Sequence, residues 1–163
     1  MTRHDFANLA DGGQALGRLL ASAGLADDAV LLGVVPNGVP VALAAAQESG
    51  LRALGLRVVR SDEGVVLEDV PDLAGACAVV IDDGVETGTV ARAVVGPLRA
   101  AGVRELVLAV PVCPREAMAD LALRYDRIIA VATPLVRRDL AWHYADFDTI
   151  DEATAEGLLR AHP

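Results

Sequence analysis

Residues 78–90 of the chain read AVVIDDGVETGTV, and this short run indicates the fold class. Its four leading apolar residues are too few for a helix and predict a buried strand, which ends at the adjacent acids Asp82 and Asp83. A short loop with glycines at Gly84 and Gly88 follows, and then a helix is predicted to begin. Glycines let the backbone approach a ligand closely, and the N–H groups of such a loop favour anions. The stretch therefore predicts an anion pocket with two carboxylates beside it.

The rest of the chain continues the alternation of strands and helices. Buried strands are predicted at 30–35, 56–59, 78–81, 106–110 and 128–131. Helices are predicted at 5–24, 39–48, 89–101 and 115–125, and a closing helix is opened by a capping box of Thr149 and Glu152. A turn at 61–64 followed by an apolar run at 65–67 predicts one added antiparallel strand.

These elements predict an α/β fold with three layers, in which a mainly parallel sheet of about five strands is flanked by helices. The length of 163 residues suits a single domain over 1–163, with a hood-like C-terminal segment at about 133–163. Hydrophobic residues make up 53% of the chain but aromatic ones only 3%, so the core is aliphatic. Such a core is typical of parallel strands covered on both faces.

Charge and cysteine usage narrow the function classes. The net charge is −9 and every basic residue is Arg, which argues against a nucleic-acid partner but still allows a small anionic ligand at a loop. Cys77 and Cys113 have no metal-binding or redox spacing and are expected to be buried thiols. No signal segment is evident, and turn-forming residues interrupt the apolar run 29–46. We therefore expect a cytoplasmic protein with no membrane partner.

Residues 78–90 resemble the ribose-phosphate signature of type I phosphoribosyltransferases, with an apolar strand, two acids, a short spacer and Thr-Gly. The similarity extends to LGVVPNGVPVA at 32–42, AVPV at 109–112, WHYADF at 142–147 and the closing helix. These stretches are similar to a bacterial branch of predicted phosphoribosyltransferases. The resemblance implies transfer of phosphoribosyl from phosphoribosyl pyrophosphate to a nucleobase-like nitrogen, with release of pyrophosphate and use of Mg²⁺.

The resemblance also implies roles for individual residues. Asp82 and Asp83 would bind the ribose hydroxyls, hold Mg²⁺ directly or through water, and stabilise developing positive charge. Glu86 would exchange a proton with the base, as a third catalytic residue, although a solvated loop carboxylate is an equal reading. The remaining implied substrate-binding residues are Pro36, Asn37 and Gly38 at the pyrophosphate, Arg60, and the phosphate loop of Gly84, Val85, Thr87, Gly88 and Thr89. A homodimer is compatible with the sequence.

Departures from the family pattern keep a second function open. Asn37 and Gly38 stand where the family has a basic residue and two glycines, Ser61 replaces a lysine after Arg60, and the long flap is missing. The alternative is a catalytically degenerate sensor of phosphoribosyl pyrophosphate or a nucleotide, or a partner-binding module. A phosphoacceptor regulator ranks last, because the chain has no lysine. In the hood, Trp142 and Tyr144 either cover the base or pack in the core.

Overall fold

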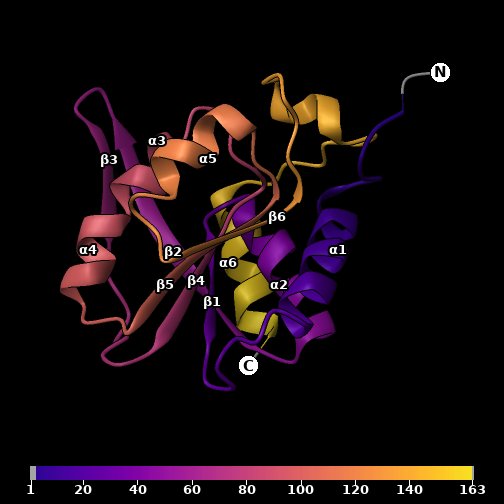
Figure 1. Cartoon of the computed structure of the whole chain (residues 1–163). Helices are drawn as coiled ribbons and strands as arrows, with labels where there is room; N and C mark the ends of the chain where they lie inside the picture. The colour runs from indigo at the N-terminus through magenta and orange to yellow at the C-terminus, as the bar shows by residue number, and fades with distance from the viewer. Residues whose placement is uncertain (1–2, 163) are drawn as a thin grey trace.

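The computed structural model describes residues 3–162 and has a six-stranded sheet at its centre (Figure 1). The strand order is β3-β2-β1-β4-β5-β6. All neighbouring strands pair in parallel except β2 and β3, which form an antiparallel hairpin. The bounds are Val30–Val34 (β1), Arg52–Ser61 (β2), Gly64–Glu68 (β3), Cys77–Ile81 (β4), Glu105–Val112 (β5) and Arg127–Ala132 (β6). The predicted parallel core and the added antiparallel strand are both confirmed.

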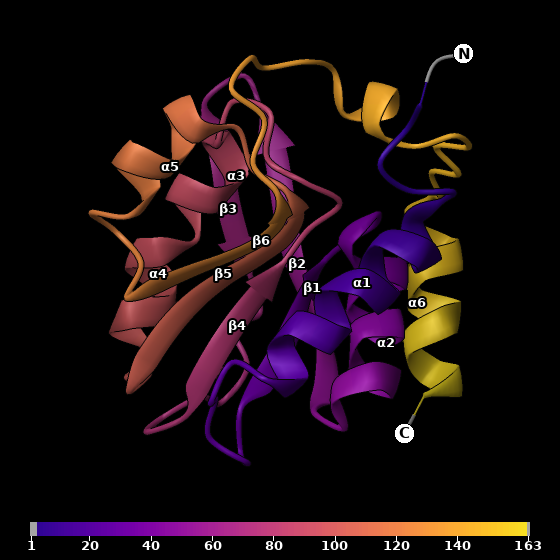
Figure 2. The same ribbon diagram turned by 45° about the vertical axis from the view of Figure 1, so that its right-hand side comes forward.

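Helices cover both faces of this sheet, which gives the three predicted layers. One face carries α1 (Leu9–Ala21), α2 (Gly38–Ser49) and α6 (Glu152–Ala161). The other carries α3 (Thr89–Ala93), α4 (Val95–Ala100) and α5 (Arg115–Leu121), as Figures 1 and 2 show. A short 3₁₀ helix, η1 (Leu140–His143), lies between β6 and α6.

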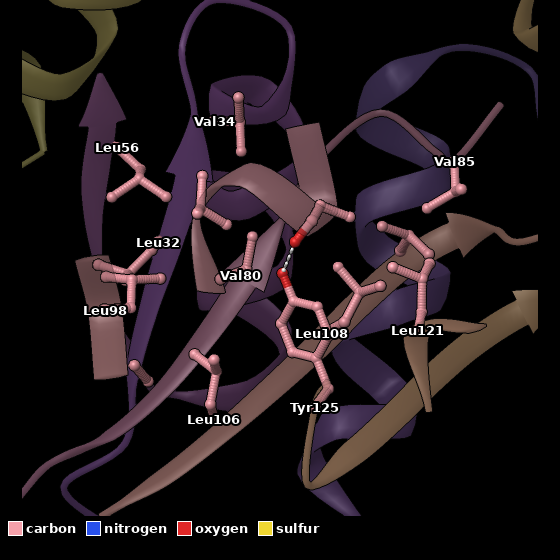
Figure 3. Packing of buried hydrophobic residues seen from close by; sticks show 14 of the residues in the cluster. Leu32, Val34, Leu56, Val80, Val85, Leu98, Leu106, Leu108, Leu121 and Tyr125 are labelled. Carbon is pink, nitrogen blue, oxygen red and sulfur yellow. Dashed lines mark hydrogen bonds between the residues drawn. The ribbon is translucent and has the colours of Figure 1, made fainter. Parts of the chain in front are cut away.

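The aliphatic core is divided between the two faces, because successive strand residues point to opposite sides. On the side of α3, α4 and α5, Leu32, Val80 and Leu108 lie in one buried cluster with Tyr125 (Figure 3). The hydroxyl of Tyr125 donates a hydrogen bond of 2.6 Å to the carbonyl oxygen of Ala91, so this buried polar group is satisfied. Each fully buried aliphatic side chain contributes about 1.5–3 kcal/mol, so the central strands hold the fold together.

The predicted helix over 89–101 is wrong as a single element, because it divides at Val94 into α3 and α4. Pro97 has no N–H to bond the carbonyl of Ala93, and its ring crowds that carbonyl. The helix that follows the acid pair is therefore only five residues long. This limits the dipole that it can present to an anion.

Several predicted boundaries also need correction. The first helix begins at Leu9 because Asn8 accepts a hydrogen bond from the N–H of Asp11, and it ends before residue 24. The closing helix is capped by Asp151, whose side chain accepts from the N–H of Thr154, so the capping box at Thr149 is wrong.

The other two corrections concern element lengths. Strand β2 is longer than the predicted 56–59, because its second half pairs with β3. Helix α5 ends at Leu121, short of the predicted 125.

Two further expectations concern membranes and thiols. In the part of the chain that the structure describes, no helix is both long enough and apolar enough to cross a bilayer. Cys77 and Cys113 are buried and unpaired, and burial raises the pKa of each thiol to about 11. Both thiols are therefore protonated at neutral pH, as expected for buried thiols.

Candidate functional site

A cavity of about 470 Å³ lies at the carboxyl-terminal edge of the parallel strands. This is the edge at which open α/β sheets usually bind ligands. Its polar wall is formed by the loop that follows β4, and its opposite wall by the β2–β3 hairpin. The lining consists of Val34, Arg60, Ser61, Gly64, Val65, Val80, Val90, Ala91, Leu108, Val110, Leu140 and the loop residues 82–89. Residues 82–90 therefore line a hollow at this edge of the sheet.

The acid pair sits where β4 ends, with little solvent around it. Asp83 is only 8% exposed, and its N–H donates a hydrogen bond of 2.8 Å to Oδ1 of Asp82. Burial raises the pKa of Asp82 well above its ordinary value, and repulsion from Asp83 adds to the increase. Burial also raises the pKa of Asp83, while the nearby charge of Arg60 lowers the pKa of both acids. Ionising both acids is therefore costly unless a cation or hydroxyl donors face them.

The loop after the acids has the backbone that glycine permits. Gly84 has φ of 153° and Gly88 has φ of 81°, and residues with a side chain rarely adopt such angles. The hydroxyl oxygens of Thr87 and Thr89 lie 3.1 Å apart, and both residues are exposed. Arg92 donates a hydrogen bond of 3.0 Å to the carbonyl oxygen of Thr87 and so braces the loop from behind. The loop thus presents two hydroxyls and its backbone to the cavity.

The hairpin supplies the cation. Arg60 lines the cavity from β2, opposite Val65 in the antiparallel register. Among residues 3–162, it is the one arginine in the lining. The structure thus brings the predicted Arg60 to the predicted acid pair. Val65 was missed, because an apolar residue in a short strand looks the same whether it faces a core or a ligand.

The second predicted loop lies at the same edge of the sheet but does not line the cavity. The side chain of Asn37 accepts a hydrogen bond of 2.9 Å from the N–H of Ile150. Gly38 is buried so tightly that a Cβ there would lie 2.6 Å from the carbonyl oxygen of Ile81. Pro36, Asn37 and Gly38 are all absent from the described lining, so their role at a pyrophosphate stays a prediction.

The predicted hood is reduced to one residue at the cavity. Leu140 lines it, and its N–H donates a hydrogen bond of 3.1 Å to Oε1 of Glu86. Tyr144 is buried, and its hydroxyl donates a hydrogen bond of 2.6 Å to the carbonyl oxygen of Asp83. This side chain therefore packs beneath the loop. Trp142 lies outside the lining, with Arg138 4.5 Å from its ring centre. No periodicity or motif in the sequence distinguishes Leu140.

The acid pair is chemically suited to Mg²⁺. This ion takes hard oxygen ligands, and it usually binds one or two carboxylates together with substrate phosphates. Asp82 and Asp83 offer such oxygens, and their raised pKa values reflect negative charge that a cation would compensate. No cluster of three or more metal-ligating side chains occurs within residues 3–162. A bound ion would therefore depend on oxygen atoms of the ligand as well.

No protein-family model matches the chain. A "Putative phosphoribosyl transferase" of Mycobacterium tuberculosis is 37% identical over 91 residues, which cover 55% of this chain and 20% of that protein. "Transcriptional regulator GfcR 2" of Methanosarcina barkeri is 33% identical over 86 residues, which cover 50% of this chain and 43% of that protein. The chain thus spans less than half of either relative.

Solved structures extend the likeness to the whole fold. A Thermus thermophilus protein, TT1426, superposes with a TM-score of 0.85 at 23% identity, covering 96% of this chain and 98% of that one. A hypoxanthine phosphoribosyltransferase of Staphylococcus aureus superposes with a TM-score of 0.60 at 16% identity, covering 78% and 74%. These folds define the class, an α/β domain of the phosphoribosyltransferase type. The resemblance to type I phosphoribosyltransferases noted in the sequence is confirmed by this shared fold and by the similarity to the curated relative from Mycobacterium.

Proposed function

We propose that this protein binds phosphoribosyl pyrophosphate and transfers the phosphoribosyl group to a nitrogenous, nucleobase-like acceptor, with release of pyrophosphate. One observation carries the proposal. A single cavity holds an acid pair, a glycine-bounded loop with two hydroxyls, and an arginine. These groups match the three parts of a phosphosugar, because carboxylates accept hydrogen bonds from hydroxyls and loop N–H groups bind phosphate.

The acid pair has the central role in this proposal. When the bond between the anomeric carbon and pyrophosphate breaks, positive charge develops on the sugar. A fixed pair of carboxylates in a poorly solvated site stabilises that charge more in the transition state than in the ground state. Mg²⁺, when bound, would neutralise charge on the leaving pyrophosphate. Asp82 and Asp83 would hold it together with oxygens of the substrate.

The loop from Gly84 to Thr89 is proposed to hold the 5-phosphate. Its two hydroxyls are exposed to the cavity, and its glycines allow N–H groups to face a ligand. Arg60 is proposed to attract the anion from the opposite wall. The proton-transfer role of Glu86 stays a prediction, since one of its carboxylate oxygens already accepts from Leu140.

The proposed partners are therefore a phosphosugar, a base and Mg²⁺, with no nucleic acid or membrane. A cytoplasmic setting agrees with the two unpaired, buried thiols. The net charge of −9 disfavours binding to a polyanion such as nucleic acid.

A binding module without catalysis is the second candidate, and one observation favours it. Asn37 and Gly38 are engaged in packing, and within the described chain Arg60 is the one arginine of the cavity, so few groups are left to stabilise a leaving pyrophosphate. The related protein from Methanosarcina is named a transcriptional regulator. Such a module would bind the phosphosugar and release nothing.

The test combines calorimetry with a product assay. Phosphoribosyl pyrophosphate is titrated with and without Mg²⁺, and pyrophosphate release is then screened over purines and pyrimidines. We expect saturable binding that strengthens with Mg²⁺, and release with at least one base. Binding without release from any base would favour the module. No binding under either condition would contradict both candidates.

A further inference from the structure

The contact between Glu86 and Leu140 joins two parts of the chain that are 54 positions apart. Glu86 lies in the loop after the acid pair. Leu140 begins η1, at the end of a segment that we call the roof segment, residues 134–140. In Figure 2 this part of the chain runs from the end of β6 to η1 along the edge where the strands end. The carboxylate of Glu86 therefore connects the phosphate loop to the chain that passes beside it.

Few other contacts hold the middle of the roof segment. At its start, Arg115 donates a backbone hydrogen bond of 3.0 Å to the carbonyl oxygen of Pro134. The side chains of Leu135 and Val136 are 73% and 67% exposed. Arg137 lies 3.9 Å from Glu116, and both side chains are at least half exposed, so that pair adds little. At the end of the segment nearest the cavity, the carbonyl of Asp139 accepts from the N–H of Trp142 at 3.0 Å and Arg138 lies over the Trp142 ring, which ties the segment to η1. The hydrogen bond from Leu140 to Glu86 ties it to the loop beside the cavity.

The side chain of Leu140 packs directly on the loop below it. A Cβ built on Gly84 would lie 2.5 Å from Cδ2 of Leu140, so the two residues are in close contact. Leu140 lines the cavity together with Val85, and no aromatic side chain of residues 3–162 lines it. The apolar surface available to a flat acceptor beside the loop is therefore aliphatic, and Leu140 supplies it from the roof segment.

From this arrangement we infer that Glu86 is a positioning residue, which fixes Leu140 as the apolar roof over the acceptor end of the cavity. The inference rests on the proposed function for the identity of the acceptor. The hydrogen bond and its effect on the roof segment can be measured without any ligand. A positioning role for Glu86 requires only an oxygen that accepts a hydrogen bond, whereas proton transfer requires an ionisable carboxyl group.

The first test uses two substitutions of Glu86. Glu86→Gln keeps an accepting oxygen, and Glu86→Ala removes it. Trp142 is the single tryptophan of the chain and lies two residues after Leu140, so its fluorescence reports on this region alone. We expect Glu86→Ala to red-shift the emission and to speed amide exchange at Leu140 about tenfold, with Glu86→Gln within about threefold of the parent. Parent-like behaviour of Glu86→Ala, or equal effects of both variants, would overturn the inference.

A second pair of variants changes the donor instead. Leu140 is the first residue of η1, and Asp139 has φ of −56° and ψ of 141°, which suit a residue before proline. Leu140→Pro therefore removes the N–H donor. Leu140→Ala is the control, because it also shortens the side chain but keeps the N–H. We expect the Trp142 emission to shift further in Leu140→Pro than in Leu140→Ala. Equal shifts would count against the hydrogen bond as the restraint.

The third readout separates positioning from chemistry. With an acceptor base found by the screen, Glu86→Ala should raise KM for the base about tenfold and leave the affinity for phosphoribosyl pyrophosphate within about twofold. Glu86→Gln should restore most of the KM. A loss of kcat in Glu86→Gln as large as that in Glu86→Ala would overturn positioning in favour of proton transfer. If no base reacts, the fluorescence and exchange results still decide the inference, while the proposed transfer fails separately.

Discussion

Two loops of this protein follow parallel strands and end at the same edge of the sheet, yet they face different surroundings. The loop at 82–89 lines the cavity with carboxylates, hydroxyls and backbone. The loop at 36–38 is packed into the protein, with Asn37 bonded to Ile150 and Gly38 against the carbonyl of Ile81. The comparison shows that a strand–turn–helix unit at the right edge does not by itself make a ligand site. Packing from distant residues decides which loop remains accessible.

The largest expected effect comes from removing the charge of the acid pair. Asp82→Asn with Asp83→Asn keeps side-chain size and the oxygen that accepts from the N–H of Asp83. We expect turnover with a reactive base to fall by about 10²–10³, because developing positive charge loses its stabiliser. Pyrophosphate release measured at saturating substrate checks this. Turnover within threefold of the parent would show that the acids do not face the reacting centre.

The next effect concerns the backbone of the ligand loop. Gly88→Val forces a β-branched residue into φ of 81°, so the loop must rearrange. We expect the affinity for phosphoribosyl pyrophosphate, measured by calorimetry, to fall about 100-fold. Gly96→Val is the matched control, because nothing lies within 4 Å of a Cβ at Gly96. If both variants bind like the parent, the phosphate lies elsewhere.

The buried carboxyl group of Asp82 should also lower the free energy of unfolding as the pH rises. Because burial raises the pKa of Asp82 in the folded protein, the folded state holds a proton that the unfolded state releases near pH 3.8. The stabilising contribution of this proton is complete below that pH and is lost as pH rises through the raised pKa. Asp82→Asn has no such loss, so it should be more stable than the parent by about 0.5–2 kcal/mol at pH 8.

Urea unfolding from pH 4 to pH 8 measures this difference. We expect the advantage of Asp82→Asn over the parent to be small near pH 4 and to grow with pH. Asp27→Asn at an exposed carboxylate outside the cavity serves as the control for simple charge removal. A constant difference across the range would mean that the raised pKa of Asp82 is not its source.

The smallest expected effect on binding comes from the packed loop. Asn37→Ala leaves the N–H of Ile150 without its acceptor, which should cost about 1–3 kcal/mol of unfolding free energy. Affinity for phosphoribosyl pyrophosphate should stay within about twofold, since Asn37 does not line the cavity. Asn37→Asp keeps the accepting oxygen and should recover most of the stability. A tenfold loss of affinity in a folded Asn37→Ala protein would show that this loop contacts the ligand.

The sequence predicts the fold and the main loop because their signals are local. Residues 78–90 contain the strand, the acids and the glycines in one run, whereas the division of the following helix at Val94 was not predicted. The packed loop could not be recognised in this way. Its partner Ile150 is 113 positions away, and Asn37 looks the same whether it faces a phosphate or a backbone N–H. Leu140 is missed for the same reason.

Whether the loop at 82–89 or the loop at 36–38 contacts the ligand can be measured directly by NMR. Backbone amide signals of the ¹⁵N-labelled protein are followed by NMR while phosphoribosyl pyrophosphate is added with Mg²⁺. We expect the largest shifts at residues 84–89, smaller ones at Arg60, and near-constant signals at Asn37 and Gly38. Large shifts at 36–38 with unchanged signals at 84–89 would contradict this expectation.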